Sequence, residues 1–146
     1  IDTSGSCSGA LVKKFLSESF SILSNQEAFA KKVNVHIIQC DDQVQSVVRI
    51  QTMEELKEYE QQFEVKGLGN TDFRPAFEYV NELIHTKEIR CLKGMLYFTD
   101  GYGIYPTKRP SYDVAFVFVG EDDSEVNVPS WAMKLVIEQE EMQIEY

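Results

Sequence analysis

The chain has 146 residues, of which 43% are hydrophobic and 12% aromatic, and this length and composition are typical of one globular domain. Fourteen Lys and Arg stand against 24 Asp and Glu, which gives a formal net charge of −10, and the basic residues are scattered along the sequence. A nucleic-acid binder is therefore excluded, because neutralising phosphates requires a basic patch or stripe. No run of about 18 apolar residues is present, so the sequence predicts no membrane-spanning segment.

The three cysteines, Cys7, Cys40 and Cys91, lie far apart and lack CxxC spacing. An odd number with such spacing argues against a disulfide framework and against a thiolate metal site. We therefore expect a reducing, cytoplasmic compartment. Cys7 sits where a helix begins, a position that can lower a thiol pKa, but no base or second cysteine accompanies it, and we interpret it as a bystander.

The sequence opens on Ile1 without a methionine, and the carboxylate of Asp2 follows at once. A strand needs about five residues, so the strand that carries Asp2 is expected to be truncated. We expect the chain to be the C-terminal part of a longer protein, with a single domain over residues 1–146 whose last residues, 138–146, form an acidic tail.

Helical and strand patterns alternate in the first half of the sequence. Apolar residues at spacings of three and four predict a helix over 8–23, which the segment 25–32 is expected to break and resume. A β-branched run predicts a buried strand over 33–40. The strand over 44–50 follows so closely that it must run antiparallel to its neighbour, at an edge of the sheet. Thr52 and Glu55 have capping-box spacing and predict a helix from Thr52 to about Phe63.

The second half continues the alternation after a loop at 66–72 that contains two glycines. Thr71 or Asp72 is expected to cap a third helix, which tolerates Pro75 in its first turn. The predicted core face of this helix consists of Phe73, Phe77, Val80 and Ile84. Three more strands are predicted, and they span 95–99, 112–119 and 131–137.

Alternating strands and helices predict an α/β fold with helices on both faces of a mostly parallel sheet and one antiparallel edge strand. Ligands of such sheets bind outside the carboxyl ends of the strands. Three loops qualify for that edge, namely 2–6, 67–72 and 100–103. Their oxygen donors are Asp2, Ser4, Ser6, Thr71 and Asp100. Capped turns are the alternative interpretation of the same residues.

These donors indicate which ion the loops could hold. Oxygen ligands without imidazole or thiolate select Mg²⁺, Ca²⁺ or Mn²⁺ over zinc or copper. Two carboxylates and three hydroxyls leave a divalent ion short of its usual six ligands, so water or an outside group must complete the set. A carboxylate from a partner would be a natural sixth ligand, which favours recognition of an acidic side chain over hydrolysis.

The motif pieces resemble a known family. Asp2-Thr3-Ser4-Gly5-Ser6, Gly69-Asn70-Thr71-Asp72 and Phe98-Thr99-Asp100-Gly101 look like the metal-ion-dependent adhesion site (MIDAS) of von Willebrand factor type A (VWA) domains, DxSxS…T…D. The segments 71–79, 97–103 and 112–114 are similar to the VWA-like domain at the C-terminal end of bacterial proteins described as predicted metallopeptidases. The family usually has a longer glycine run where this chain has Gly67-Leu68-Gly69-Asn70.

The resemblance implies a Rossmann-like three-layer αβα sandwich with Mg²⁺ at the top edge of its sheet. Ser4 and Ser6 would bind the ion directly, and Asp2, Thr71 and Asp100 directly or through water. The implied partner is a protein that offers an Asp or Glu carboxylate. It could be a MoxR-type ATPase, because relatives often sit beside one, or the upstream domain of the same protein.

The function predicted from these patterns is a metal-dependent protein-interaction module, not an enzyme. One alternative is a Mg²⁺-dependent phosphotransfer enzyme in which Asp2 accepts the phosphoryl group. Another is a scaffold whose metal site is vestigial. The sequence contains no HExxH, so a peptidase activity would have to lie upstream.

Several other residues allow two interpretations. Arg74 either steers an acidic ligand or is a solvated residue at the start of a helix. Tyr102 and Tyr105 either line the rim of the site or pack within their loop. Trp131 is interpreted as a core anchor, and the two histidines of the sequence as structural residues.

Overall fold

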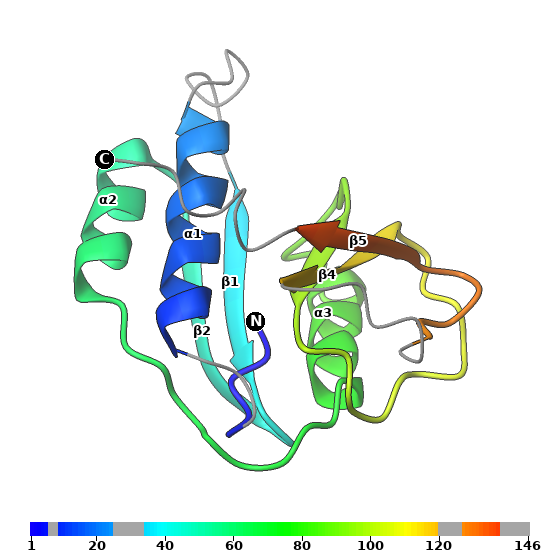
Figure 1. The fold of residues 1–146 in the computed structure, drawn as a ribbon. Helices are drawn as coiled ribbons and strands as arrows, with labels where there is room; N and C mark the ends of the chain where they lie inside the picture. Colours follow the sequence, from blue (N-terminus) through cyan, green and yellow to red (C-terminus); the bar gives the residue numbers. More distant parts are fainter. Residues whose placement is uncertain (6–8, 25–33, 120–126, 138–146) are drawn as a thin grey trace.

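The computed structural model describes residues 1–5, 9–24, 34–119 and 127–137. Within these residues the elements are α1 (Gly9–Ser24), β1 (Val35–Cys40), β2 (Val44–Ile50), α2 (Met53–Gln62), α3 (Arg74–His85), β3 (Met95–Phe98), β4 (Val114–Val119) and β5 (Met133–Ile137) (Figure 1). Every helix and strand predicted in this part of the chain is present, with ends that differ by one or two residues. The predictions for Ser6, Cys7, residues 25–32 and the tail at 138–146 lie outside the described residues.

Helix α2 begins as its local sequence predicts. The Thr52 hydroxyl accepts a hydrogen bond from the backbone N–H of Glu55 at 3.1 Å. The Glu55 carboxylate reaches back and accepts one from the N–H of Gln51 at 3.0 Å. The first bond satisfies one backbone donor that the start of a helix leaves unpaired, and the second holds the residue before the N-cap.

Helix α3 begins differently from the prediction. Its N-cap position is Phe73, whose apolar side chain cannot cap, so the predicted capping residues Thr71 and Asp72 lie just before the N-cap. Asp72 still accepts a hydrogen bond from the N–H of Arg74 at 3.0 Å. Along the helix, Leu83 is buried and Ile84 is only half-buried, because the buried stripe lies slightly to one side of the predicted one.

Two sets of strands pair in different senses. β1 and β2 are antiparallel, with Val35 opposite Ile50, as predicted for the edge strand. β3, β4 and β5 are parallel and lie in that order. The structure therefore has the α/β character predicted from the alternation of elements.

Residues 1–3 connect these two sets of strands. The N–H of Cys40 donates to the carbonyl of Ile1, and the N–H of Thr3 donates to the carbonyl of Cys40, both at 3.0 Å. On the other side, the N–H of Asp2 donates to the carbonyl of Phe98 at 2.8 Å. Asp2 and Cys40 form a parallel bridge. The first residues of the chain thus lie between β1 and β3, next to the carboxyl ends of both.

Helices pack on both sides of the strands. One buried cluster combines residues of α1 and α2 with Ile37, Phe98 and Val117, and the other combines residues of α3 with Ile38, Tyr97 and Phe116. Neighbouring residues of a strand belong to different clusters, because successive side chains point to opposite faces. Accordingly, α1 and α2 lie on one side of the strands and α3 on the other (Figure 1).

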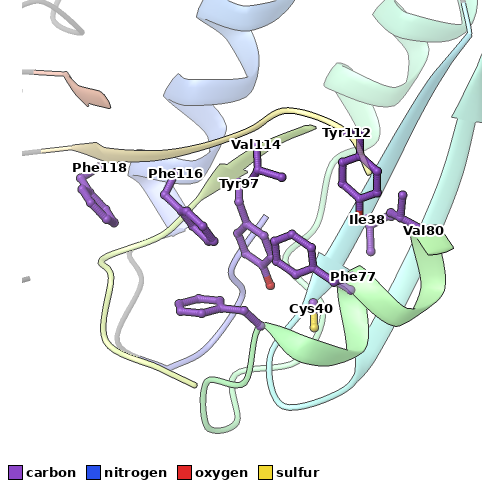
Figure 2. Close-up of a cluster of buried hydrophobic side chains, with 11 residues drawn as sticks. Ile38, Cys40, Phe77, Val80, Tyr97, Tyr112, Val114, Phe116 and Phe118 are labelled. Carbon is purple, nitrogen blue, oxygen red and sulfur yellow. The ribbon is translucent and has the colours of Figure 1, made fainter. Parts of the chain in front are cut away.

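The cluster beneath α3 is built around aromatic rings (Figure 2). Phe116 is fully buried. Its ring lies 5.0 to 6.4 Å, centroid to centroid, from those of Phe73, Phe77, Tyr97, Tyr105 and Trp131. Trp131 therefore packs against the core from the segment before β5, as predicted.

In the part of the chain that the structure describes, no helix combines the length and the apolar character needed to cross a membrane.

Phe116→Ala should destabilise the domain strongly, because it removes a fully buried ring that other aromatic residues surround. We expect the free energy of unfolding to fall by about 3–5 kcal/mol, measured by chemical denaturation. Leu96→Ala is the control, since Leu96 is 61% exposed, and its cost should stay near the small value typical of surface changes. Equal costs would contradict the assignment of the core.

Candidate functional site

Three loops meet beside the carboxyl ends of β1 and β3. Residues 1–5 contact the 66–72 loop through two backbone hydrogen bonds, from Leu68 N–H to the Thr3 carbonyl at 2.8 Å and from Gly5 N–H to the Gly69 carbonyl at 3.0 Å. The 66–72 loop in turn joins the 99–105 loop, where Asp72 and Ile104 form a parallel bridge. The three loops that the sequence assigned to one edge of the sheet are therefore adjacent.

Thr71 packs closely against the loop that follows β3. A Cβ atom at Gly103 would lie 2.6 Å from Cγ2 of Thr71 and 3.0 Å from the ring of Phe73. Only glycine allows this approach. Thr71 is half-buried there, and the residues of this loop include Asp100.

Asp2 is fully buried and anchors the first loop. Its Oδ2 accepts a hydrogen bond from the Thr99 hydroxyl at 2.6 Å, and its Oδ1 accepts one from the Ser4 N–H at 2.9 Å. Asp2 forms no salt bridge with any residue that the structure describes. A buried carboxylate that lacks a cationic partner is costly, so this position is suited to bind a cation.

The other predicted ligands belong to the same three loops as this carboxylate. Ser4 is buried, and Asp100 is half-buried with its Oδ1 accepting a hydrogen bond from the Tyr102 N–H at 3.2 Å. Ser6 lies outside the described residues. Among the residues described, His, Cys, Asp and Glu nowhere gather in a group of three or more that could hold a metal ion. A metal at this edge would therefore need hydroxyl ligands as well as carboxylates.

Thr99 is a residue whose role the sequence analysis missed. Its hydroxyl donates to Asp2 and accepts a hydrogen bond from the Gly101 N–H at 3.0 Å. This one side chain thus ties the loop after β3 to the carboxylate of the first loop. Its position as the last residue before Asp100, at the end of a buried strand, was the available signal.

Asp41 is a second residue that was missed. It directly follows the last residue of β1 and is buried. Its carboxylate accepts hydrogen bonds of 3.0 Å from the N–H of Gly69, the N–H of Gln43 and the side-chain amide of Gln45. Asp41 is a carboxylate at the end of a buried strand, and the same pattern identified Asp2 and Asp100. The sequence around Asp41 is also typical of a turn, which is why Asp41 was not selected.

The charge of Asp41 depends on these hydrogen bonds. Burial by itself would raise the pKa of this carboxyl, but the donors from Gln45, Gln43 and Gly69 outweigh burial and hold the pKa below its usual value. The bond to Gly69 fixes the 66–72 loop, which carries Thr71.

The glycines of the 66–72 loop are required by the close approach of Asp41. A Cβ atom at Gly67 or Gly69 would lie 2.9 or 2.8 Å from Oδ2 of Asp41. Gly67 also has a φ of +127°, which other residues rarely adopt. The loop thus keeps glycine where it contacts Asp41, while Leu68 between them is 64% exposed.

The structure shows the surroundings of Arg74, Tyr102 and Tyr105, for which the sequence allowed two interpretations. Arg74 forms a salt bridge with Asp72 at 2.8 Å, and hydrogen bonds from Arg74 lower the pKa of that carboxyl. The Tyr105 hydroxyl donates to the Gly101 carbonyl at 2.8 Å, and burial raises the pKa of Tyr105 to about 12, so this residue packs within its loop. Tyr102 is 60% exposed in the same loop, and its two interpretations stay open.

Neither histidine lies in the candidate site. His36 is part of β1 and half-buried, and burial lowers its pKa. His85 is exposed at the end of α3.

Parallel strands flanked by helices, with oxygen-bearing loops gathered beside the strand ends, define an α/β domain with a candidate ligand-binding edge. The chain belongs to the family described as "VWA-like domain (DUF2201)", which matches residues 1–138. The predicted resemblance to VWA-like domains is thereby confirmed. Comparisons with curated proteins and with solved structures find no match.

Asp41→Asn should loosen the 66–72 loop, because an amide cannot accept all three hydrogen bonds and turns its own N–H toward at least one of these donors. We expect the free energy of unfolding at pH 7 to fall by about 1–3 kcal/mol, measured by denaturation. Asp113→Asn is the control, since Asp113 is exposed and lies outside these loops. A loss of the same size in both variants would contradict the role of Asp41.

The cost of Asp41→Asn should also depend on pH. The folded-state pKa of Asp41 lies below its ordinary value of 3.8. Its charge therefore stabilises the fold above that value, and this contribution is lost as the pH falls through the folded-state pKa. The difference between wild type and variant should thus be largest near neutral pH and shrink below about pH 4. A difference that grows on acidification would contradict this assignment.

Proposed function

We propose that this domain is a metal-dependent protein-interaction module. A Mg²⁺ ion, or Ca²⁺ or Mn²⁺ in its place, would be held by Asp2, Ser4, Ser6, Thr71 and Asp100. A carboxylate of a partner protein would take a remaining coordination position. The observation that carries the proposal is the fully buried Asp2 carboxylate, which lacks a salt-bridge partner among the described residues where three oxygen-bearing loops meet.

The chemistry of the donors fits such an ion. A carboxylate offers about four lone-pair positions, and each Asp2 oxygen is shown with one hydrogen bond, so both retain capacity for a metal. Hydroxyl and carboxylate oxygens are the ligands that Mg²⁺ and Ca²⁺ prefer. When bound, the ion would supply positive charge at the edge of the sheet and so attract an acidic side chain.

The arrangement of the strands supports the proposal that the fold is a Rossmann-like three-layer αβα sandwich. If residues 1–3 represent a central strand, the order across the sheet is β2, β1, residues 1–3, β3, β4 and β5. In chain order this reads third, second, first, fourth, fifth and sixth, as in doubly wound sheets. The order reverses between residues 1–3 and β3, beside Asp2 and Asp100, where such folds bind ligands.

The surface around these loops favours a protein partner over a small ligand. Leu68, Tyr102 and Ile104 are 64%, 60% and 49% exposed, and all three belong to the loops that border the candidate site. Exposed apolar residues that gather at one place are typical of interaction surfaces. We therefore propose a partner whose Asp or Glu is flanked by apolar side chains. A MoxR-type ATPase and the upstream domain of the same protein remain predictions from the resemblance, and a cytoplasmic location remains a prediction from the number and spacing of the cysteines.

The alternatives from the sequence also remain predictions. The phosphotransfer enzyme requires an accessible phosphoryl acceptor, and no observation favours it at Asp2, which is fully buried. The scaffold with a vestigial site predicts that partner binding does not change when EDTA removes divalent ions.

Metal binding should require the proposed ligands. Titration calorimetry of the full chain with MgCl₂ should show binding that Asp100→Asn or Thr71→Val weakens by at least about tenfold, because an outer-shell change alone can cost that much. Asp113→Asn, an exposed site elsewhere, should bind as wild type. Thermal unfolding in EDTA should show that all variants are folded. Equal heats for wild type and Asp100→Asn would overturn the proposal.

The backbone conformation of Leu68 should lower the stability of the fold. Its φ of 73° lies in the left-handed region, which costs a residue with a side chain about 1–2 kcal/mol. Leu68→Gly removes that strain but loosens the unfolded chain, so we expect the free energy of unfolding to be unchanged or to rise by up to about 1 kcal/mol. Mg²⁺ affinity should not change.

The matched control is Leu96→Gly, because Leu96 is similarly exposed but lies within β3. Glycine within a strand should lower the free energy of unfolding by about 0.5–1 kcal/mol. If Leu68→Gly were as destabilising as Leu96→Gly, the backbone strain at Leu68 would be disproved.

A further inference from the structure

We infer that a groove between α3 and the 106–111 loop binds an acidic segment of a partner protein that carries an apolar side chain. The groove has a volume of about 610 Å³, which lies within the range of sites that bind ligands. It lies along α3, and its recognition chemistry does not require the proposed metal site.

The groove has an apolar base. Phe77 of α3 is buried and takes part in the aromatic cluster, and Ile84, the next-to-last residue of α3, is half-buried. Pro106 and Pro110 face them from the loop and are also half-buried. Proline fixes its own backbone angle, so the loop side of the groove changes little in shape. A segment that binds there would not first have to order this loop.

The walls of the groove are basic, in contrast to the rest of the chain. Lys108, Arg109, Arg74 and His85 line it, against one acidic residue, Glu78. The whole chain has 24 acidic residues and 14 Lys and Arg, so the balance is reversed here. Lys108 and Arg109 are exposed and form no salt bridge with any residue in the described part of the chain, whereas Arg74 is bound to Asp72. The positive charges that remain available for a ligand therefore belong to Lys108 and Arg109 of the 106–111 loop.

The groove also contains polar side chains that could form hydrogen bonds with the main chain of a peptide. Asn81, Thr107 and Ser111 line the groove with an amide and two hydroxyls. Within the residues that the structure describes, none of these side chains forms a hydrogen bond. They can therefore donate to and accept from the main chain of a bound segment.

These features together select one class of ligand. From Arg74 to His85 the helix extends about 16 Å, the length of about five residues of extended peptide. A free phosphate would leave the apolar base of the groove unused, and a nucleic acid would need a longer basic stripe than these few side chains offer. A segment with Asp or Glu on both sides of one aromatic or aliphatic residue fits both features. Its apolar side chain would pack on the base of the groove, and its carboxylates would contact the basic walls.

The inference can be tested by fluorescence anisotropy with the full chain in EDTA, so that no metal-dependent contact contributes. The probe is a labelled peptide with one central Phe flanked by Glu on both sides. It should bind saturably, and Lys108→Glu combined with Arg109→Glu should weaken binding by at least about tenfold, because attraction becomes repulsion at two positions. Asn81→Trp, which fills the groove without changing charge, should also weaken binding.

The matched control is Arg90→Glu combined with Lys93→Glu, which changes the net charge equally at exposed positions outside the groove. It should bind within about twofold of wild type, and circular dichroism should show that all variants are folded. Absence of saturable binding, equal weakening by both pairs, or equal affinity for a peptide with Ser in place of Phe would overturn the inference.

A further variant separates a partner from the chain's own acidic tail. Glu138, Glu140, Glu141 and Glu145 are changed together to Gln, and probe affinity should stay the same. A rise in affinity would show that the tail occupies the groove, which would overturn the assignment to a partner protein. Because the metal site is not used in any of these measurements, their outcome is independent of the proposed function.

Discussion

The fold and the candidate site depend on the same few hydrogen bonds, those that hold residues 1–3 between β1 and β3. Thr3 and Ile1 pair with Cys40 on one side, and Asp2 pairs with Phe98 on the other. Among the described residues, no other backbone hydrogen bonds link the ends of β1 and β3 through a shared strand segment. The carboxylate of Asp2 is carried by this connecting segment. A change that displaces the segment must therefore disturb the continuity of the strands and the geometry of the site together.

Asp41 and Thr99 attach the loops of the candidate site to the ends of the strands. Asp41 holds Gly69 from the end of β1, and Thr99 holds Asp2 from the end of β3. The bond from Thr99 is buried and the bond to Asp41 is part-buried, and hydrogen bonds are stronger where water is excluded. The loops that carry Thr71 and Asp100 are thus attached to rigid strands on both sides. Sites held in this way can bind a ligand without first ordering their own residues.

The sequence predicted the features whose signals are local. Apolar periodicity located α1, and the spacing of Thr52 and Glu55 located the start of α2, because both patterns arise within one element. The start of α3 was predicted only approximately, since backbone contacts with other segments help to place it. The N–H of Asp72 pairs with the Asp41 carbonyl, and the N–H of Phe73 pairs with the Ile104 carbonyl. Asp41 was missed for the same reason, because its role depends on a loop that returns 28 residues later.

The charge of the chain limits how its two proposed surfaces could act. Both would bind acidic groups, yet the net charge of −10 repels an acidic partner at a distance. Salt screens such repulsion beyond about 10 Å at 0.1 M, whereas Lys108 and Arg109, or a bound metal ion, attract at contact. Long-range attraction would therefore contribute little to association. Selectivity would come from short-range fit, since only an acidic group that reaches the groove or the loop edge gains a local cation. A highly acidic partner without a matching apolar side chain would gain the charge contacts but leave the exposed apolar residues uncovered.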